Sequence, residues 1–207
     1  MASPINVIFV PFRDQVAHDG RLSVLEWKRR ALWDCRERNE LVCLLAEKLA
    51  AWPRRWLRQH GFATNTIALS RRHRQRVVVL TEGAAHAQRL APLLPGWAVH
   101  DAVPVTYEPG DEPEEPDRDA LLPPGRIATL MYAYRNDLAT DILVRATGHR
   151  GKLDWAHIRG GDGWAGSEPA LVVDIGDETD ARGRADTDAR RREYDEQGLL
   201  ELTANAG

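Results

Sequence analysis

The sequence lacks any apolar run near the roughly 18 residues that a membrane-spanning helix needs. Its first residues, "MASPINVIFVPFRD", carry no basic segment before their short apolar stretch, as a secretory signal would. We therefore expect a cytoplasmic protein without a membrane partner.

Cysteine is scarce. The chain has two, Cys35 and Cys43, both in a segment with helical periodicity, and they lack the CxxC spacing of many zinc sites. The histidines do not fall at the intervals of metal ligands, and no Ser/His/Asp or Cys/His arrangement can be identified from spacing. We expect no metal, no disulfide framework and ordinary helix residues at both cysteines. His86 fits a surface or helix-cap position better than a catalytic one.

The chain also lacks an overall basic character, because its formal net charge is −3. Its charges are nevertheless segregated. Basic residues gather in "KRRALWDCRERN", "PRRWLRQHG" and "SRRHRQR", whereas "EPGDEPEEPDRDA" is acidic. Two interpretations are open: solvated helix faces, or one face that binds polyanions. The acidic, proline-rich loop 108–125 is expected to be exposed and mobile.

Strand-like and helix-like segments alternate along the chain. Short apolar runs with β-branched residues predict strands in "INVIFVPF", "RVVVL", "WAVHDAVPV", "DILVRAT" and "ALVVDIG". Helices are expected after a Ser23/Glu26 capping box, in "NELVCLLAEKLAAW", in "TEGAAHAQRLAPLLP", and in "DARRREYDEQ" up to Gly198. "RIATLMYAYR" fits either a strand or a short helix. Almost continuously apolar strands between helices indicate an α/β fold in a single domain, with a parallel sheet covered by helices on both faces.

"TDILVRATGHRGKLD", residues 140–154, looks like a strand that enters a glycine-rich basic loop. The loop approaches the relaxed P-loop pattern, but Leu153 stands where a hydroxyl should bind Mg²⁺. The following "DWAHIRGGDG" is also a poor helix, so the helix N-terminus that completes a phosphate cradle is missing. In "ALVVDIGDE", Asp174 and Asp177 resemble a Walker B acid, although residues that cap a loop at a strand's end look the same.

In their order, these segments resemble the second RecA-like lobe of superfamily 2 helicases. "RVVVLTEGAAHAQRL" resembles motif IV of that family, "RATGHRGKLD" motif V and "ARGRADTDARRREY" motif VI. The resemblance implies a RecA-like helicase C-terminal-like domain at 35–200, preceded by an N-terminal strand and helix at 1–34 and followed by a flexible tail at 201–207.

The resemblance also implies roles for the residues of the motif V segment. Thr147 matches the threonine that contacts the nucleic-acid backbone, and we expect His149, Arg150 and Lys152 to lie close to the same phosphates. Asp154 matches the aspartate near the ATP site, and Gly151 lies one residue from the usual glycine, whose place Lys152 takes. Gly151 and Asp154 are therefore expected to contact a nucleotide cofactor.

In the motif VI segment, Gly183 and Arg184 match the family pattern, and Arg184 joins the expected cofactor contacts. Asp180 replaces the family's glutamine and Thr187 replaces its final arginine. An arginine that projects from this helix could stabilise phosphoryl charge as an arginine finger does. The candidate fingers are Arg190, Arg191 and Arg192.

A helicase ATP site lies between two lobes, and this chain has no room for a first lobe with its Walker A loop. The resemblance therefore implies no ATP hydrolysis by the chain alone, and ATP and Mg²⁺ only if a partner lobe completes the site. Three interpretations follow: a split motor whose ATPase lobe is a separate chain, a degenerate lobe that binds nucleic acid (DNA or RNA) or protein, and a fragment. The alternative is a stand-alone α/β enzyme that binds a nucleotide or sugar phosphate at residues 147–154.

Overall fold

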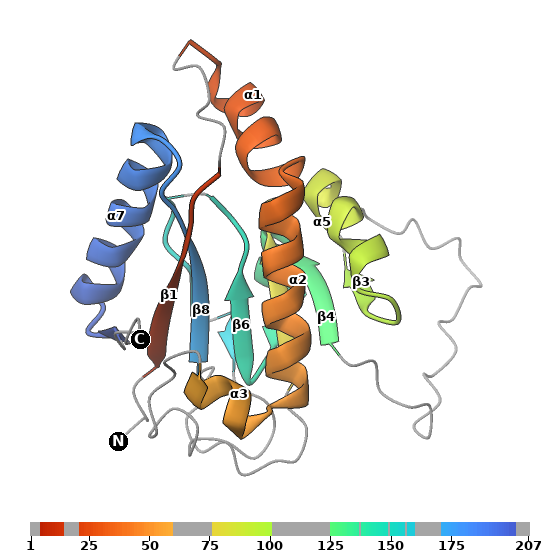
Figure 1. The fold of residues 1–207 in the computed structure, drawn as a ribbon. Helices are drawn as coiled ribbons and strands as arrows, with labels where there is room; N and C mark the ends of the chain where they lie inside the picture. The colour runs from red at the N-terminus through yellow and green to blue at the C-terminus, as the bar shows by residue number, and fades with distance from the viewer. Residues whose placement is uncertain are drawn as a thin grey trace.

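The computed structural model describes residues 5–14, 21–59, 76–100, 125–136, 138–148, 150–155, 157–159 and 171–201. Within these residues the chain forms a seven-stranded sheet in the order β3-β4-β2-β6-β8-β1-β9, and all of its pairings are parallel (Figure 1). The strands are β1 (Asn6–Phe12), β2 (Val77–Thr81), β3 (Ala98–His100), β4 (Gly125–Thr129), β6 (Ile142–Arg145), β8 (Leu171–Asp177) and β9 (Leu200–Glu201). A separate parallel pair joins β5 (Leu138–Ala139) and β7 (Ile158–Arg159).

Helices cover both faces of this sheet. In chain order, the described helices are α1 (Val24–Lys28), the π-helix η1 (Arg29–Trp33), α2 (Arg36–Ala51), α3 (Arg54–Gln59), α5 (Ala84–Leu90), the 3-10 helix η2 (Ala91–Leu93), α6 (Leu130–Asn136) and α7 (Ala181–Glu196). In β2, Val77 and Val79 pack in the core cluster of α2 and α5, whereas Val78 and Leu80 pack in the cluster that contains Tyr194 of α7. Because strand side chains alternate between faces, burial of both faces explains the continuous apolar strands. The predicted α/β fold with a parallel sheet is confirmed.

The predicted helix cap at Ser23 and helix stop at Gly198 are confirmed. The Ser23 hydroxyl accepts a hydrogen bond from the Glu26 amide, and the Glu26 carboxylate accepts one from the Ser23 amide, which completes the capping box. Gly198, at φ +70°, follows the end of α7 in the left-handed region that favours glycine. The ambiguous "RIATLMYAYR" is divided between β4 and α6. Helix α7 begins earlier than expected because the Asp180 carboxylate caps the Gly183 amide at 2.8 Å.

Two side chains lie deeper than the sequence suggests. Asp174 is inside β8 and fully buried, so it does not cap a loop, whereas Asp177 does end the strand. His86 is 1% exposed, so the expectation of a surface or cap residue is wrong. Both polar side chains are retained inside because the fold supplies them with hydrogen-bond partners.

Strand β1 lies between β8 and β9 and pairs with β8 along all seven of its residues. The N-terminal segment 1–34 therefore contributes a strand to the same sheet as segment 35–200. The acidic loop 108–125, apart from Gly125, and residues 202–207 of the expected tail lie outside the described residues. No helix in the described part has the length and hydropathy to cross a membrane.

Candidate functional site

In a parallel sheet the carboxyl ends of all strands meet at one edge, which is where α/β folds bind ligands. Here α1 and η1 lie at that end of the sheet (Figure 1). Three contacts join them to the loops after three different strands: Lys28 forms an ion pair with Glu82, Trp27 Nε1 donates to the Asp180 carboxylate at 2.7 Å, and Gly148 packs against Leu32. The helical segment therefore holds the loops after β2, β8 and β6 in fixed positions.

The Gly148 contact leaves no room for a side chain. A Cβ atom at Gly148 would overlap the side chain of Leu32, which is fully buried, so Leu32 or the loop would have to shift. We expect Gly148→Ala to lower the free energy of unfolding by about 1–3 kcal/mol through overpacking. Urea denaturation measures the change.

The matched control for this substitution is Gly83→Ala, because a Cβ atom at Gly83 meets nothing within 4 Å. Leu32→Ala should also destabilise the protein by creating a cavity, but in the double variant the two costs should fall well short of their sum, because the overlap is gone. Strict additivity would contradict the packing described.

An open cavity of about 300 Å³ lies between α1 and the first turns of α7. It is lined by Val24, Lys28, Arg150, Arg182 and Asp186. The cations outnumber the carboxylates here, even when the partner of Lys28 is counted. This composition suits an anionic ligand, such as a phosphate or carboxylate group that a guanidinium group can bind through two parallel hydrogen bonds.

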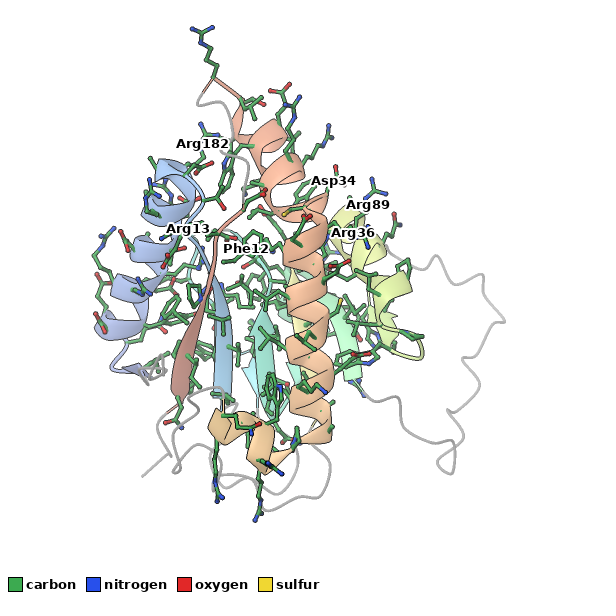
Figure 2. The ribbon with its side chains drawn as sticks, in the orientation of Figure 1. Phe12, Arg13, Asp34, Arg36, Arg89 and Arg182 are labelled. Atoms are coloured by element: carbon green, nitrogen blue, oxygen red, sulfur yellow. The ribbon has the colours of Figure 1, made fainter. Side chains whose placement is uncertain are left out.

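The three cations are held in different ways. Lys28 is mostly buried in its ion pair, whereas the Arg150 side chain is 64% exposed and pairs with Asp186, Nε to Oδ1, at 2.6 Å. Arg182 lies over the ring of Trp27, with its guanidinium carbon 5.7 Å from the ring centroid, and donates to the carbonyl of Leu22 at 3.3 Å. Figure 2 shows Arg182 at the start of α7, on the side of α1. Among the described residues no carboxylate pairs with Arg182, so it has charge to offer a ligand.

A buried arginine holds the loop that follows β6 and carries Arg150. Arg145 Nε donates to the Thr147 hydroxyl at 3.1 Å, Nη2 to the Gly151 carbonyl at 2.7 Å, and Nη1 to the Tyr194 hydroxyl at 2.8 Å. Thr147 is fully buried as a result. Its hydroxyl supports the loop from inside and does not face solvent, where a nucleic acid would lie.

After Arg150 the loop leaves the edge and runs along α7. The Leu153 amide donates to Glu193 at 3.0 Å, and Trp155 Nε1 donates to Gln197 at 2.7 Å. Lys152 lies 3.9 Å from Glu196, in the last turn of α7. Leu153 is buried in the core cluster of this face, so the residue that breaks the P-loop pattern is a packing residue.

The residues expected to form one phosphate site are therefore spread over two regions. Of the predicted nucleic-acid contacts, Arg150 lines the cavity, Thr147 is buried against Arg145, and Lys152 lies toward the far end of α7. His149 lies outside the described residues.

The predicted cofactor contacts are also separated from one another. Gly151 uses its carbonyl to hold Arg145, and exposed Asp154 lies 3.8 Å from His157. Arg184 is exposed in the first turn of α7 and donates to the Glu178 carbonyl at 2.9 Å. These three residues do not form one site in this structure.

The three candidate fingers have unlike environments. Arg190 is fully buried and paired with Asp174 at 3.0 Å, so it does not project from the helix as a finger must. The Arg191 guanidinium lies over the Phe9 ring, 4.6 Å from its centroid. Arg192 is exposed. Of the three, Arg192 alone is fully presented to solvent.

Sequence patterns missed three residues of the cavity: Lys28, Arg182 and Asp186. Arg182 and Asp186 belong to the segment that resembles motif VI, and Lys28 opens the first basic cluster. What the sequence does not show is that α1 folds back onto the start of α7. That placement depends on contacts such as the one between Trp27 and Asp180, which are 153 residues apart.

Neither cysteine has the environment of a nucleophile. Burial raises the pKa of Cys43 to about 12 and also raises the pKa of Cys35, so both thiols stay protonated near neutral pH. No group of three or more His, Cys, Asp or Glu side chains in the described part of the chain is arranged to hold a metal ion. Compared with the cysteines, the basic cavity is the better candidate for a ligand site, because it offers cationic side chains to an anion.

Comparison with known proteins adds no assignment. The chain matches no family model, and no curated protein matches it.

Proposed function

We propose that this chain is a helicase C-terminal-like lobe that binds the phosphate backbone of a nucleic acid in the cavity between α1 and α7. The observation that carries the proposal is the convergence of Lys28, Arg150 and Arg182 at the carboxyl edge of an all-parallel sheet. Phosphates carry a full negative charge each, and basic side chains supply most contacts to them without regard to base sequence. An acidic protein can bind in this way if its cations gather at one place.

A ligand that enters the cavity can replace the carboxylate that pairs with Arg150 in the free protein. Arg150 reaches the cavity from an exposed position and its present partner, Asp186, lines the same cavity. A phosphate could take the place of that carboxylate and receive two parallel hydrogen bonds from the guanidinium group. Arg182 would add a second cation from the facing helix.

This chain would not hydrolyse ATP by itself under this proposal. The segment that approaches the P-loop pattern runs along α7, and its Leu153 is buried. A motor function would therefore need a separate ATPase lobe. Copurification of a chain with a Walker A loop would support that arrangement.

Substitution of the cavity arginines tests the proposal. We expect Arg150→Gln/Arg182→Gln to weaken binding of a fluorescent single-stranded oligonucleotide about tenfold at low salt. The slope of log affinity against log salt should also flatten by about 1.4, because each lost phosphate contact removes about 0.7. Fluorescence anisotropy over a salt series gives both quantities.

The matched control is Lys152→Gln/Arg192→Gln, which removes the same charge from two exposed residues outside the cavity. Its affinity should stay within about twofold of the wild type. If the control loses as much affinity as the cavity variant, net charge and not the cavity governs binding, and the proposal is wrong. It is equally wrong if the wild type binds no oligonucleotide at low salt.

A second candidate function is binding of a nucleotide or sugar phosphate by a stand-alone enzyme. The cavity volume of about 300 Å³ favours it, because that volume is at the lower end for small-molecule sites. A rise of several degrees in the melting temperature with ATP or a nucleotide sugar, lost in the cavity variant, would support this candidate over the first.

A further inference from the structure

Helix α3 presents three arginines to solvent at the opposite end of the sheet from the cavity (Figure 1). Arg54, Arg55 and Arg58 are all exposed. At 100° per residue they fall within one third of the helix circumference. Leu57 is fully buried and Trp56 packs partly buried against the core, and this anchoring turns the arginines outward.

Within the described part of the chain, these arginines have no internal partner. Arg54, Arg55 and Arg58 form no ion pair or hydrogen bond with any residue that the structure describes. Other exposed arginines are paired, among them Arg36 with Glu40 and Arg89 with Asp34. The arginines of α3 are therefore not explained by local charge pairing.

The sequence around α3 also lacks acidic residues. No Asp or Glu occurs between Glu47 and Glu82, although the chain as a whole is acidic. Over the same interval Lys or Arg occurs repeatedly, at positions 48, 54, 55, 58, 71, 72, 74 and 76. A surface that only needed solubility would mix both signs, so one sign maintained over this interval points to an anionic partner.

We propose that the exposed face of α3, formed by Arg54, Arg55 and Arg58, is a second contact surface for a nucleic-acid backbone. The face fits a chain of phosphates because it offers cations at regular spacing. It does not fit an amphipathic membrane helix, because such a helix inserts apolar side chains and Leu57 is buried in the protein core. Three arginines are also fewer than the four to eight basic residues of typical lipid-binding clusters. The inference does not depend on the cavity between α1 and α7.

The two surfaces are far enough apart to require a long strand. Helix α1, which lines the cavity, and helix α3 lie at opposite ends of α2 (Figure 1), whose 16 residues span roughly 24 Å at 1.5 Å per residue. With one phosphate per about 3.4 Å along a stacked strand, this distance corresponds to about seven nucleotides. A strand much shorter than this can contact one surface at a time, and a longer one can contact both and gain from bivalent binding.

The test compares the affinity of wild type and Arg54→Gln/Arg55→Gln/Arg58→Gln for single strands of 5 and 30 nucleotides over a salt series. We expect the triple variant to lose about tenfold in affinity for the long strand at low salt. Its salt slope should flatten by about 2, the value for three lost contacts at about 0.7 each. Replacing the same three residues with lysine should restore most of the binding, because lysine keeps the charge that a phosphate contact needs.

The matched control is Arg36→Gln/Arg89→Gln/Arg135→Gln, which removes the same charge from three exposed arginines elsewhere. Little loss of affinity is expected there. The inference is overturned if the α3 variant binds the long strand as wild type does, or if the control loses as much. It is also overturned if the α3 substitutions abolish binding to vesicles of anionic lipid and leave nucleic-acid binding intact.

The outcomes separate this inference from the proposed function. If the α3 variant loses affinity for the oligonucleotide while the cavity variant binds it as wild type does, the α3 surface is supported and the proposed binding in the cavity is wrong. If only the cavity variant loses affinity, the proposed α3 surface is wrong and binding in the cavity is supported.

Discussion

Replacing Asp174 with asparagine is expected to lower the free energy of unfolding by about 3–5 kcal/mol. Asp174 is fully buried inside β8. Its carboxylate accepts hydrogen bonds from Arg190 Nε at 3.1 Å and from the Tyr194 hydroxyl at 2.9 Å, and Arg145 Nε lies 3.8 Å away. Asparagine keeps the shape of the side chain but leaves two buried guanidinium groups with one carboxylate fewer. Because total stability is about 5–15 kcal/mol, urea denaturation should show the loss clearly.

The control for Asp174 is Asp188→Asn on the surface of α7. The Asp188 side chain is 58% exposed and 3.8 Å from Arg191, so its loss should change stability by no more than about 0.5 kcal/mol. If Asp174→Asn does not fold, Tyr194→Phe provides a milder change. It removes one hydroxyl from the same cluster and should cost about 1–3 kcal/mol. A loss below about 1 kcal/mol for Asp174→Asn would show that the buried charges do not depend on this carboxylate.

The buried ion pairs of β8 fix the position of α7, the helix that carries a cavity arginine. Arg190 holds α7 to β8 through Asp174, and on the other face Arg38 of α2 donates to Asp177 at 2.7 Å. Two carboxylates of one strand thereby fix one helix on each face of the sheet. Since Arg182 is carried by α7, loosening Asp174 should also misplace a cavity arginine. Folded variants at this position should therefore bind nucleic acid more weakly if the proposed function is right.

Most of the fold could be predicted from the sequence because its signals are local. Ser23 and Glu26 are three residues apart and cap the same turn, and Gly198 ends a helix through its own φ angle. The apolar runs of β2 and β8 identify buried parallel strands directly, because both faces are covered. The predicted start of α7 at Asp188 is too late, because the helix is capped by Asp180, a position that the family motif assigns to another role.

The site could be predicted only in part because its residues owe their roles to distant contacts. Arg182 and Arg190 lie on one helix with the same side chain, yet Arg182 lines a cavity and Arg190 is buried beside Asp174. No local pattern distinguishes them. Arg145 is a similar case, since an arginine at the end of an apolar strand gives no sign that it will hold the loop after it.

His86 should make the protein less stable in mild acid. Burial, with a smaller contribution from the nearby Arg38 cation, lowers the pKa of His86 to about 3 in the folded protein. In the unfolded chain the pKa is about 6.5. Between these values the unfolded state binds one proton more than the folded state, so the free energy of unfolding falls as the pH falls. We expect His86 to contribute about 1.4 kcal/mol per pH unit to the slope of the free energy of unfolding against pH. Urea denaturation between pH 6 and pH 4 measures this slope.

The side-chain hydrogen bond of His86 identifies its neutral tautomer and guides the choice of a control substitution. Asn39 donates to the Trp33 carbonyl at 2.8 Å, which orients its amide so that Asn39 Oδ1 accepts from His86 Nε2 at 3.2 Å. The proton of neutral His86 is therefore on Nε2, and buried Nδ1 has no partner among the described residues that would accept a hydrogen bond from it if it became protonated. His86→Gln keeps a donor near the Nε2 position and removes the titrating group, so its stability curve should lose the slope assigned to His86. His100→Gln should also reduce the slope of the unfolding free energy against pH, but by less, because partial burial lowers the pKa of His100. Equal slopes in wild type and His86→Gln, or an imidazole NMR titration of His86 near pH 6.5, would show that this side chain is accessible to water and charged in the folded protein.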